Sequence, residues 1–215
     1  DNFTKFNLSN YQEYIVDLIE KIHIENITDI DKNYLYRDIL IFVQGNTQIS
    51  YIENHVHYLN YAILSKGVEY TKKHSDTQQK KYITGAKEIK TYYLMPIPLS
   101  SAHINKGSKE YMNLYSEIDT LTVPIYEFKG MERTDKIISV QKVSRRVMIG
   151  TNAIETGITI DTLGYCIDSG WVKESQFNPN FGCNMLIDKN VTKSSARQRR
   201  GRIGRKAPGV FYGCY

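Results

Sequence analysis

Short apolar segments alternate with helical patterns along this chain, and this alternation is the feature that most constrains its fold. Apolar runs typical of buried strands cover residues 38–45, 92–97, 122–128, 146–150 and 163–168. Helical spacing relates the apolar residues between positions 14 and 22, and helical patterns also cover residues 47–64 and 111–118. Strands separated by helices favour a parallel sheet covered on both faces. We therefore predict an α/β domain with a largely parallel central sheet flanked by helices.

Two segments depart from this alternation. Residues 66–90 are dominated by Lys, Gln, Thr, Ser and Gly, which predicts a surface insertion. Residues 171–177 and 183–187 flank a stretch rich in turn residues, which predicts a β-hairpin extension.

Composition limits the class of protein. The chain has 215 residues, of which 41% are hydrophobic and 12% aromatic, enough for one globular domain with a real core. No apolar run approaches the eighteen or so residues of a membrane span. Cys166, Cys183 and Cys214 are too few and too scattered for a disulfide framework or a zinc site, so we expect a reducing, intracellular location. The histidines, including His55 and His57, form no credible ligand set, and we expect them on the surface.

The charge is concentrated in one place. The chain has 28 basic and 23 acidic residues, a net charge of +5. Seven of the basic residues lie between Lys193 and Lys206 with no acidic residue among them, and the remainder of the chain is slightly acidic. This pattern indicates a local anionic partner instead of a generally basic protein.

Two polar segments are candidates for chemistry. Residues 150–161 follow a predicted strand and are rich in small polar side chains, and ligands of α/β sheets bind at the carboxyl ends of such strands. Thr192 is a plausible N-cap of a helix that runs into residues 198–205. On that helix Arg202 and Arg205 would share one face, where two guanidinium groups suit a polyphosphate.

The same segments carry a resemblance to superfamily 2 helicases. Residues 198–205, QRRGRIGR, match the sixth conserved motif of those enzymes. Residues 151–160, TNAIETGITI, resemble the fifth motif of the DEAH branch, and residues 39–45, ILIFVQG, are similar to its fourth motif. The phosphate-loop pattern and the D-E-x-[HD] tetrad, which belong to the first RecA-like domain in that family, are absent from the sequence. The resemblance therefore implies that residues 1–215 are the second, C-terminal RecA-like domain of a longer chain.

The resemblance also implies roles for individual residues. Gln198, Arg202 and Arg205 would face the γ-phosphate, with Arg205 as the arginine finger. Nucleotide-binding positions would be Gly157, which replaces the usual Ser, Thr159, Asp161 and Tyr126, although Tyr126 is equally well interpreted as a packing aromatic. The nucleic-acid backbone would be contacted by Gly45, Ser100, Ser101, Thr151 and Asn152. Arg199 has no implied phosphate contact, and we expect it to form an ion pair or an exposed charge worth under about 1 kcal/mol.

These roles predict an ATP-dependent helicase that acts on RNA, with DNA as the alternative substrate. ATP or another NTP would bind with Mg²⁺, and the metal would be held mainly by the first RecA-like domain, so we expect the isolated domain to be inactive. No protein metal site and no membrane partner are expected. Arg200 in the sixth motif is similar to poxviral and flaviviral members, which favours a viral source and hence host cytoplasm or virion. The competing hypothesis is a non-enzymatic RNA-binding module that uses the basic segment 193–206.

Overall fold

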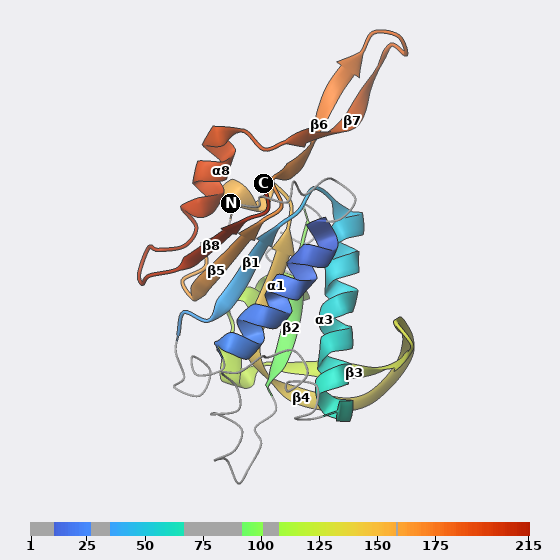
Figure 1. Ribbon diagram of the computed structural model, residues 1–215, viewed down its shortest axis with the longest axis vertical. Coiled ribbons are helices and arrows are strands. Elements are labelled where there is room, and N and C mark those ends of the chain that lie inside the picture. Colours follow the sequence, from blue (N-terminus) through green and yellow to red (C-terminus); the bar gives the residue numbers. More distant parts are fainter. Residues whose placement is uncertain (1–10, 27–34, 67–91, 101–107, 158) are drawn as a thin grey trace, which may run out of the picture.

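Figure 1 shows the computed structural model, which describes residues 11–26, 35–66, 92–100, 108–157 and 159–215. The predicted insertion at residues 66–90 lies outside these ranges except for Lys66, and Ser101 also lies outside them. The helices are α1 (Tyr11–Glu25), α3 (Asn46–Lys66), α6 (Lys109–Tyr115), α7 (Ile154–Gly157) and α8 (Lys193–Arg200), with a 3₁₀ turn at Ile118–Thr120. The strands are β1 (Asp38–Phe42), β2 (Tyr93–Leu99), β3 (Thr122–Lys129), β4 (Glu132–Gly150), β5 (Leu163–Asp168), β6 (Trp171–Asn178), β7 (Cys183–Asn190) and β8 (Val210–Gly213).

The central sheet confirms the predicted fold class. Its strand order is β2-β4-β1-β5-β8, and every neighbouring pair in this path is parallel. All residues of β1 and β5 are buried, which explains why both strands are continuous apolar runs instead of alternating ones. Helices α1 and α3 lie together over one face of the sheet (Figure 1). Within the described residues, no helix is both long and apolar enough to cross a lipid bilayer.

The outer strand β2 runs further than its prolines suggest. The sequence predicts a strand that ends at Ile97, but β2 contains Pro96 and Pro98 and continues to Leu99. In the described part of the chain β2 pairs only with β4, and an edge strand tolerates residues that lack a backbone donor. Asn60 of α3 bonds both the N–H and the carbonyl of Leu94, at 2.9 and 2.7 Å, and so satisfies part of that edge.

Strand β4 is much longer than the predicted strand at residues 146–150. Its first half forms an antiparallel ribbon with β3, which turns at Gly130 with φ of 64° and curves beneath α3 (Figure 1). The ring of Tyr126 on β3 lies 5.1 Å from His57 of α3. His57 is therefore buried, and the prediction of surface histidines is wrong for it and for His23.

The predicted β-hairpin extension is present. Among the described strands, β6 and β7 pair only with each other, and they project from the body of the domain (Figure 1). The hairpin exposes the apolar side chains of Phe177, Phe181, Met185 and Leu186. Its first strand begins three residues after β5 ends, so the hairpin starts directly at the carboxyl end of β5.

Candidate functional site

The carboxyl ends of four parallel strands meet at one edge of the sheet. In the strand register, Gly150 of β4 lies beside Phe42 of β1 and Leu99 of β2, and Phe42 also lies beside Asp168 of β5. The segments that follow these strands therefore gather Gly45, Ser100, Thr151 and Asn152 along one edge, as ligand sites of α/β sheets require. Asn152 is exposed and Thr151 is half-buried, whereas Ser100 is buried beneath the edge.

Gly45 has a cationic neighbour that the sequence did not reveal. A Cβ built at Gly45 would lie 3.6 Å from Cδ of Lys173, so this β6 lysine lies directly against the glycine. The hairpin thus adds a positive charge to the same edge, which suits a phosphate backbone. The two residues are distant in the sequence, and only the hairpin's root at the sheet edge brings them together.

The arginine segment follows a capped helix. Thr192 is the N-cap of α8, as predicted, and its hydroxyl accepts a hydrogen bond from the Ser195 N–H at 3.2 Å. The helix ends at Arg200, and the Gly201 N–H donates to the Arg197 carbonyl at 3.0 Å. Arg202 and Arg205 therefore do not share a helix face, which corrects that part of the prediction.

A turn, in place of a helix face, still brings the two arginines together. Gly204 adopts φ of 76°, which reverses the chain between them. Both side chains line one small pocket, together with the apolar residues Leu40, Ile154, Ile160 and Leu163. Gln198 is exposed on the last turn of α8.

The electrostatics of this pocket suit an anion. Burial lowers the pKa of Arg202, and the charge of Arg205 lowers it further. Two neighbouring cations destabilise each other until an anion lies between them. The Arg205 Nε donates to the carbonyl of Gly201, the C-cap of α8, at 3.2 Å, so the guanidinium contacts the end of that helix.

Thr159 and Asp161 lie near the arginine segment. Asp161 is paired with Lys206 at 2.5 Å, and both side chains are 54% exposed. Gly157 ends α7, two residues before Thr159. An aromatic residue near Thr159 is Tyr115, and burial and Tyr111 raise its pKa.

The structure does not bring Tyr126 to this place. Tyr126 pairs with Ile137 in the β3–β4 ribbon and stacks under Arg133 at 4.9 Å. Ile137 lies eleven residues along β4 from Met148, the neighbour of the pocket residue Leu40, which is about 36 Å of extended strand. The sequence prediction did not include Tyr115. The one feature of the sequence that could have drawn attention to it is its position four residues after Tyr111, which puts both rings on one face of α6.

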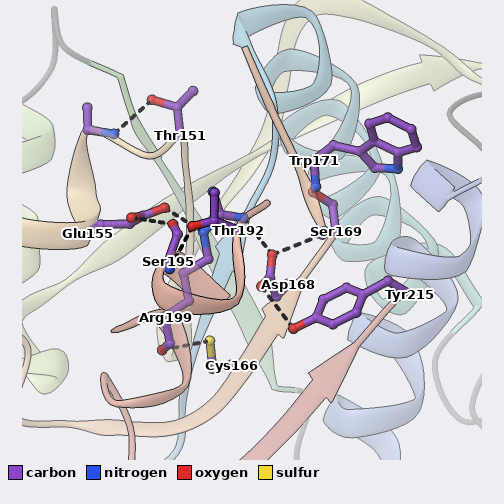
Figure 2. A network of polar contacts seen from close by, with 12 residues as sticks. Thr151, Glu155, Cys166, Asp168, Ser169, Trp171, Thr192, Ser195, Arg199 and Tyr215 are labelled. Carbon is purple, nitrogen blue, oxygen red and sulfur yellow. Dashed lines mark hydrogen bonds and ion pairs between the residues drawn. The ribbon is translucent and has the colours of Figure 1, made fainter. Parts of the chain in front are cut away.

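Arg199 is the centre of a buried polar network (Figure 2). Its Nε lies 2.6 Å from Oε1 of Glu155, and its Nη1 lies 2.6 Å from Oδ1 of Asp168. The Arg199 side chain is 0% exposed and its guanidinium lies 4.9 Å over the ring of Phe42. The ion pair that we expected at Arg199 is therefore present. The expected contribution of under about 1 kcal/mol is wrong, because this pair is buried and removing one partner of a buried pair costs about 3–5 kcal/mol.

Comparison with known proteins gives the same assignment as the motifs. Residues 102–207 match the family model of the helicase conserved C-terminal domain. "Putative RNA Helicase B962L" of African swine fever virus is 30% identical over 210 residues, 98% of this chain and 18% of the viral protein. "Probable ATP-dependent RNA helicase DHX35" of Homo sapiens is 28% identical over 183 residues, 82% of this chain and 25% of that protein. The crystal structure of the E. coli DExH-box NTPase HrpB has a TM-score of 0.45 at 20% identity, over 82% of this chain and 15% of that chain.

The fold is therefore a largely parallel α/β sheet, and the arginine segment that follows α8 runs alongside β5. The match to the helicase conserved C-terminal domain covers just under half of this chain, and the similar proteins are named RNA helicases, among them "ATP-dependent RNA helicase DEAH12, chloroplastic" of Arabidopsis thaliana. The chain spans 18% of the length of the viral relatives that it matches.

Proposed function

We propose that this chain is the second motor domain of an ATP-dependent RNA helicase, and that it supplies the arginine finger in trans to a nucleotide held by the first RecA-like domain. The observation that carries the proposal is the pocket that Arg202 and Arg205 share with Leu40 of β1 and Leu163 of β5. The relatives' names, which include ATP-dependent RNA helicases, support the same function.

The nucleotide would meet this domain through two groups of residues. Gln198, Arg202 and Arg205 would face the γ-phosphate, and Arg205 would leave the Gly201 carbonyl to reach the phosphoryl oxygens. Asp161 would leave Lys206 to bind the ribose, beside Thr159 and the end of α7 at Gly157. Tyr115, which is exposed and near the Thr159 backbone, replaces Tyr126 as the proposed platform for the base. The Mg²⁺ ion would neutralise phosphate charge and would be held mainly by the first domain.

Nucleic acid would lie along the edge formed by Gly45, Thr151 and Asn152. These groups and Lys173 can contact phosphates and sugars, and such contacts carry little sequence information. When NTP closes the cleft between the two domains, the segment that holds Arg205 and the edge that holds RNA move as parts of one domain. Alternating closure and opening would then move the strand.

The alternative, a non-enzymatic module that binds RNA through segment 193–206, has less support. That segment is not a uniform cationic surface, because Arg199 is buried and Arg202 is half-buried. Lys206 is also paired with an acidic side chain.

The test uses the full-length parent protein, since this domain has no phosphate-loop sequence of its own. We expect Arg205→Ala to lower kcat for RNA-stimulated ATP hydrolysis about 10³-fold, while nucleotide affinity changes much less. Arg205→Lys should not restore the rate, because an ammonium lacks the planar fork. Arg200→Ala is the matched control. This arginine is exposed and does not line the pocket, so the kcat of the variant should stay within about twofold of wild type. A near-normal kcat in Arg205→Ala would remove the finger assignment.

A further inference from the structure

The Arg199 side chain bridges two elements that otherwise follow different strands of the sheet. Its Nε binds Glu155 on α7, and its Nη1 binds Asp168 at the end of β5 (Figure 2). A second bond joins the same helices, because the Ser195 hydroxyl of α8 donates to the other Glu155 oxygen at 2.6 Å. Glu155 thus holds α7 to α8 by both of its carboxylate oxygens.

The α7 end of this bridge lies beside the nucleic-acid edge. Glu155 is three residues after Asn152, and its own N–H donates to the Asn152 carbonyl at 3.0 Å. Helix α7 is only four residues long, so it has little intrinsic stability. Buried Ile154 and Glu155 are the contacts that fix its position in the described chain.

The α8 end of the bridge lies beside the nucleotide-facing residues. Arg199 follows Gln198 directly, and its carbonyl accepts the Arg202 N–H at 3.1 Å. The same carbonyl accepts the Cys166 thiol at 3.8 Å, which ties the segment to β5. A shift of the Arg199 main chain therefore moves Gln198 and Arg202 with it.

The Asp168 end adds the root of the hairpin. Its Oδ1 accepts the Gly170 N–H at 3.0 Å as well as the Arg199 guanidinium, and the Ser169 N–H donates to the Phe42 carbonyl at 3.1 Å. Lys173 lies three residues beyond Gly170, against Gly45. One guanidinium thus joins the two parts of the nucleic-acid edge and the arginine segment.

Burial makes this joint stiff. Water cannot replace either carboxylate, because the side chains of Arg199 and Asp168 are 0% exposed and that of Glu155 is 11% exposed. An unpaired buried charge is costly, so the three groups are expected to keep their contacts and move as one body. A displacement of the Thr151–Asn152 edge then also displaces the arginine segment, and the reverse holds as well.

We propose that Arg199, with Glu155 and Asp168, is a positioning residue through which nucleic acid bound at the Thr151–Asn152 edge places Gln198, Arg202 and Arg205 for hydrolysis. This inference rests on the proposed function. It assigns to Arg199 no contact with nucleotide, and it makes RNA stimulation of hydrolysis depend on an ion pair that touches neither ligand.

Arg145 provides a matched control for the purely structural alternative. Its side chain is also fully buried, makes two hydrogen bonds, to the carbonyls of Ile22 and Asn26 at the end of α1, and lies 5.4 Å over the ring of Tyr165. None of these contacts involves the arginine segment or the nucleic-acid edge. Arg145→Lys should therefore cost stability as Arg199→Lys does, without affecting communication between the sites.

The experiment compares wild type, Arg199→Lys, Glu155→Gln and Arg145→Lys in the full-length parent protein. Two ratios are measured: kcat with saturating single-stranded RNA over kcat without it, and the RNA Kd without nucleotide over that with a non-hydrolysable ATP analogue. Coupling between two sites is commonly 5–150-fold in equilibrium affinity. We expect both ratios to fall by about tenfold or to near 1 in Arg199→Lys and Glu155→Gln.

The outcomes separate the two proposals. If wild type hydrolyses no NTP in the presence of RNA, the proposed function fails. If wild type is stimulated and both variants keep its ratios, the function stands and the role of Arg199 is overturned. It is overturned equally if Arg145→Lys lowers the ratios as much, or if Arg199→Lys and Glu155→Gln both fail to fold while Arg145→Lys folds.

Discussion

His23 and His57 are buried imidazoles on the two helices that cover one face of the sheet. The Nε2 atom of His23 bonds the Tyr92 carbonyl at 3.1 Å, and His57 packs edge-on against Tyr126. Burial, with the charge of Arg145, lowers the pKa of His23 to about 3. Burial, with the charge of Arg133, lowers the pKa of His57 to about 4.

These pKa values predict acid-sensitive stability. The unfolded chain takes up the histidine protons near the ordinary pKa of 6.5, whereas the folded domain takes them up only near 3 and 4. The free energy of unfolding is therefore highest above pH 6.5. It decreases as the pH falls below 6.5, by about 2 kcal/mol per histidine at pH 5. Urea unfolding at pH 7.5 and pH 5 measures the loss. His23→Gln keeps a donor for Tyr92 but takes no proton, so an unchanged pH dependence in this variant would contradict the assignment.

Single residues were the hardest to predict from the sequence. The motifs identified Arg202 and Arg205 as a pair because their spacing brings them together under either a helix or a turn. The burial of Arg199 could not be predicted, because its partners Glu155 and Asp168 lie 44 and 31 residues away. The residues next to Arg199 in the sequence do not indicate that carboxylates from distant parts of the chain neutralise its charge.

At the scale of elements, capping residues determine where the arginine segment points. Gly201 ends α8, and Gly204 turns the chain with a positive φ where a built Cβ meets nothing within 4 Å. The spacing of Arg202 and Arg205 predicted a helix that extends past Arg200. That prediction did not take into account that Gly201 and Gly204 end the helix and turn the chain. The ribbon of β3 and β4 was missed for another reason: the first half of β4 is largely exposed and has no apolar alternation.

Gly204→Ala tests the turn without adding a steric clash. An alanine in the left-handed region costs about 1–2 kcal/mol, which we expect to see as lost stability. Because Arg205 follows directly, RNA-stimulated hydrolysis by the full-length protein should also fall.

Gly130→Ala is the control for this variant. Gly130 has φ of 64° and equally open surroundings at the β3–β4 turn, so the loss of stability should be similar. Hydrolysis by Gly130→Ala should remain close to wild type once the folded fraction is taken into account. Equal rates in the two variants would show that the Gly204 turn does not position Arg205.

At the scale of the whole molecule, the parallel sheet was the most predictable feature. Apolar runs identified β1, β5 and the second half of β4, and parallel pairing then required their carboxyl ends to meet at one edge. The contribution of the projecting hairpin to that edge, through Lys173, depends on three-dimensional placement and was not predictable.

If the edge at Gly45, Thr151 and Asn152 binds RNA as proposed, its chemistry predicts the mode of binding. We expect weak binding that is nearly independent of sequence and falls steeply with salt, because the contacts go to phosphates and sugars. Lys173→Ala should reduce the slope of log K against log salt by about 1, whereas the exposed hairpin residue Lys189, paired with Glu174, should contribute little. Titration of unrelated single-stranded RNAs at several salt concentrations measures both quantities. A strong preference for one sequence at physiological salt would contradict the assignment.

The resting contacts of Arg205 and Lys206 have a consequence for selectivity. Each cation already has an internal acceptor, the Gly201 carbonyl for Arg205 and Asp161 for Lys206. The oxygens of an incoming ligand must replace these internal acceptors. The affinity therefore reflects only how much stronger the contacts with the ligand are than the internal contacts that they replace. A lone inorganic phosphate can displace one contact at a time and gains little. If the domain binds nucleotide as proposed, a ligand with a ribose hydroxyl at one end and a terminal phosphate at the other would displace both contacts in a single event. The length of an anion would then decide its affinity more than its charge does.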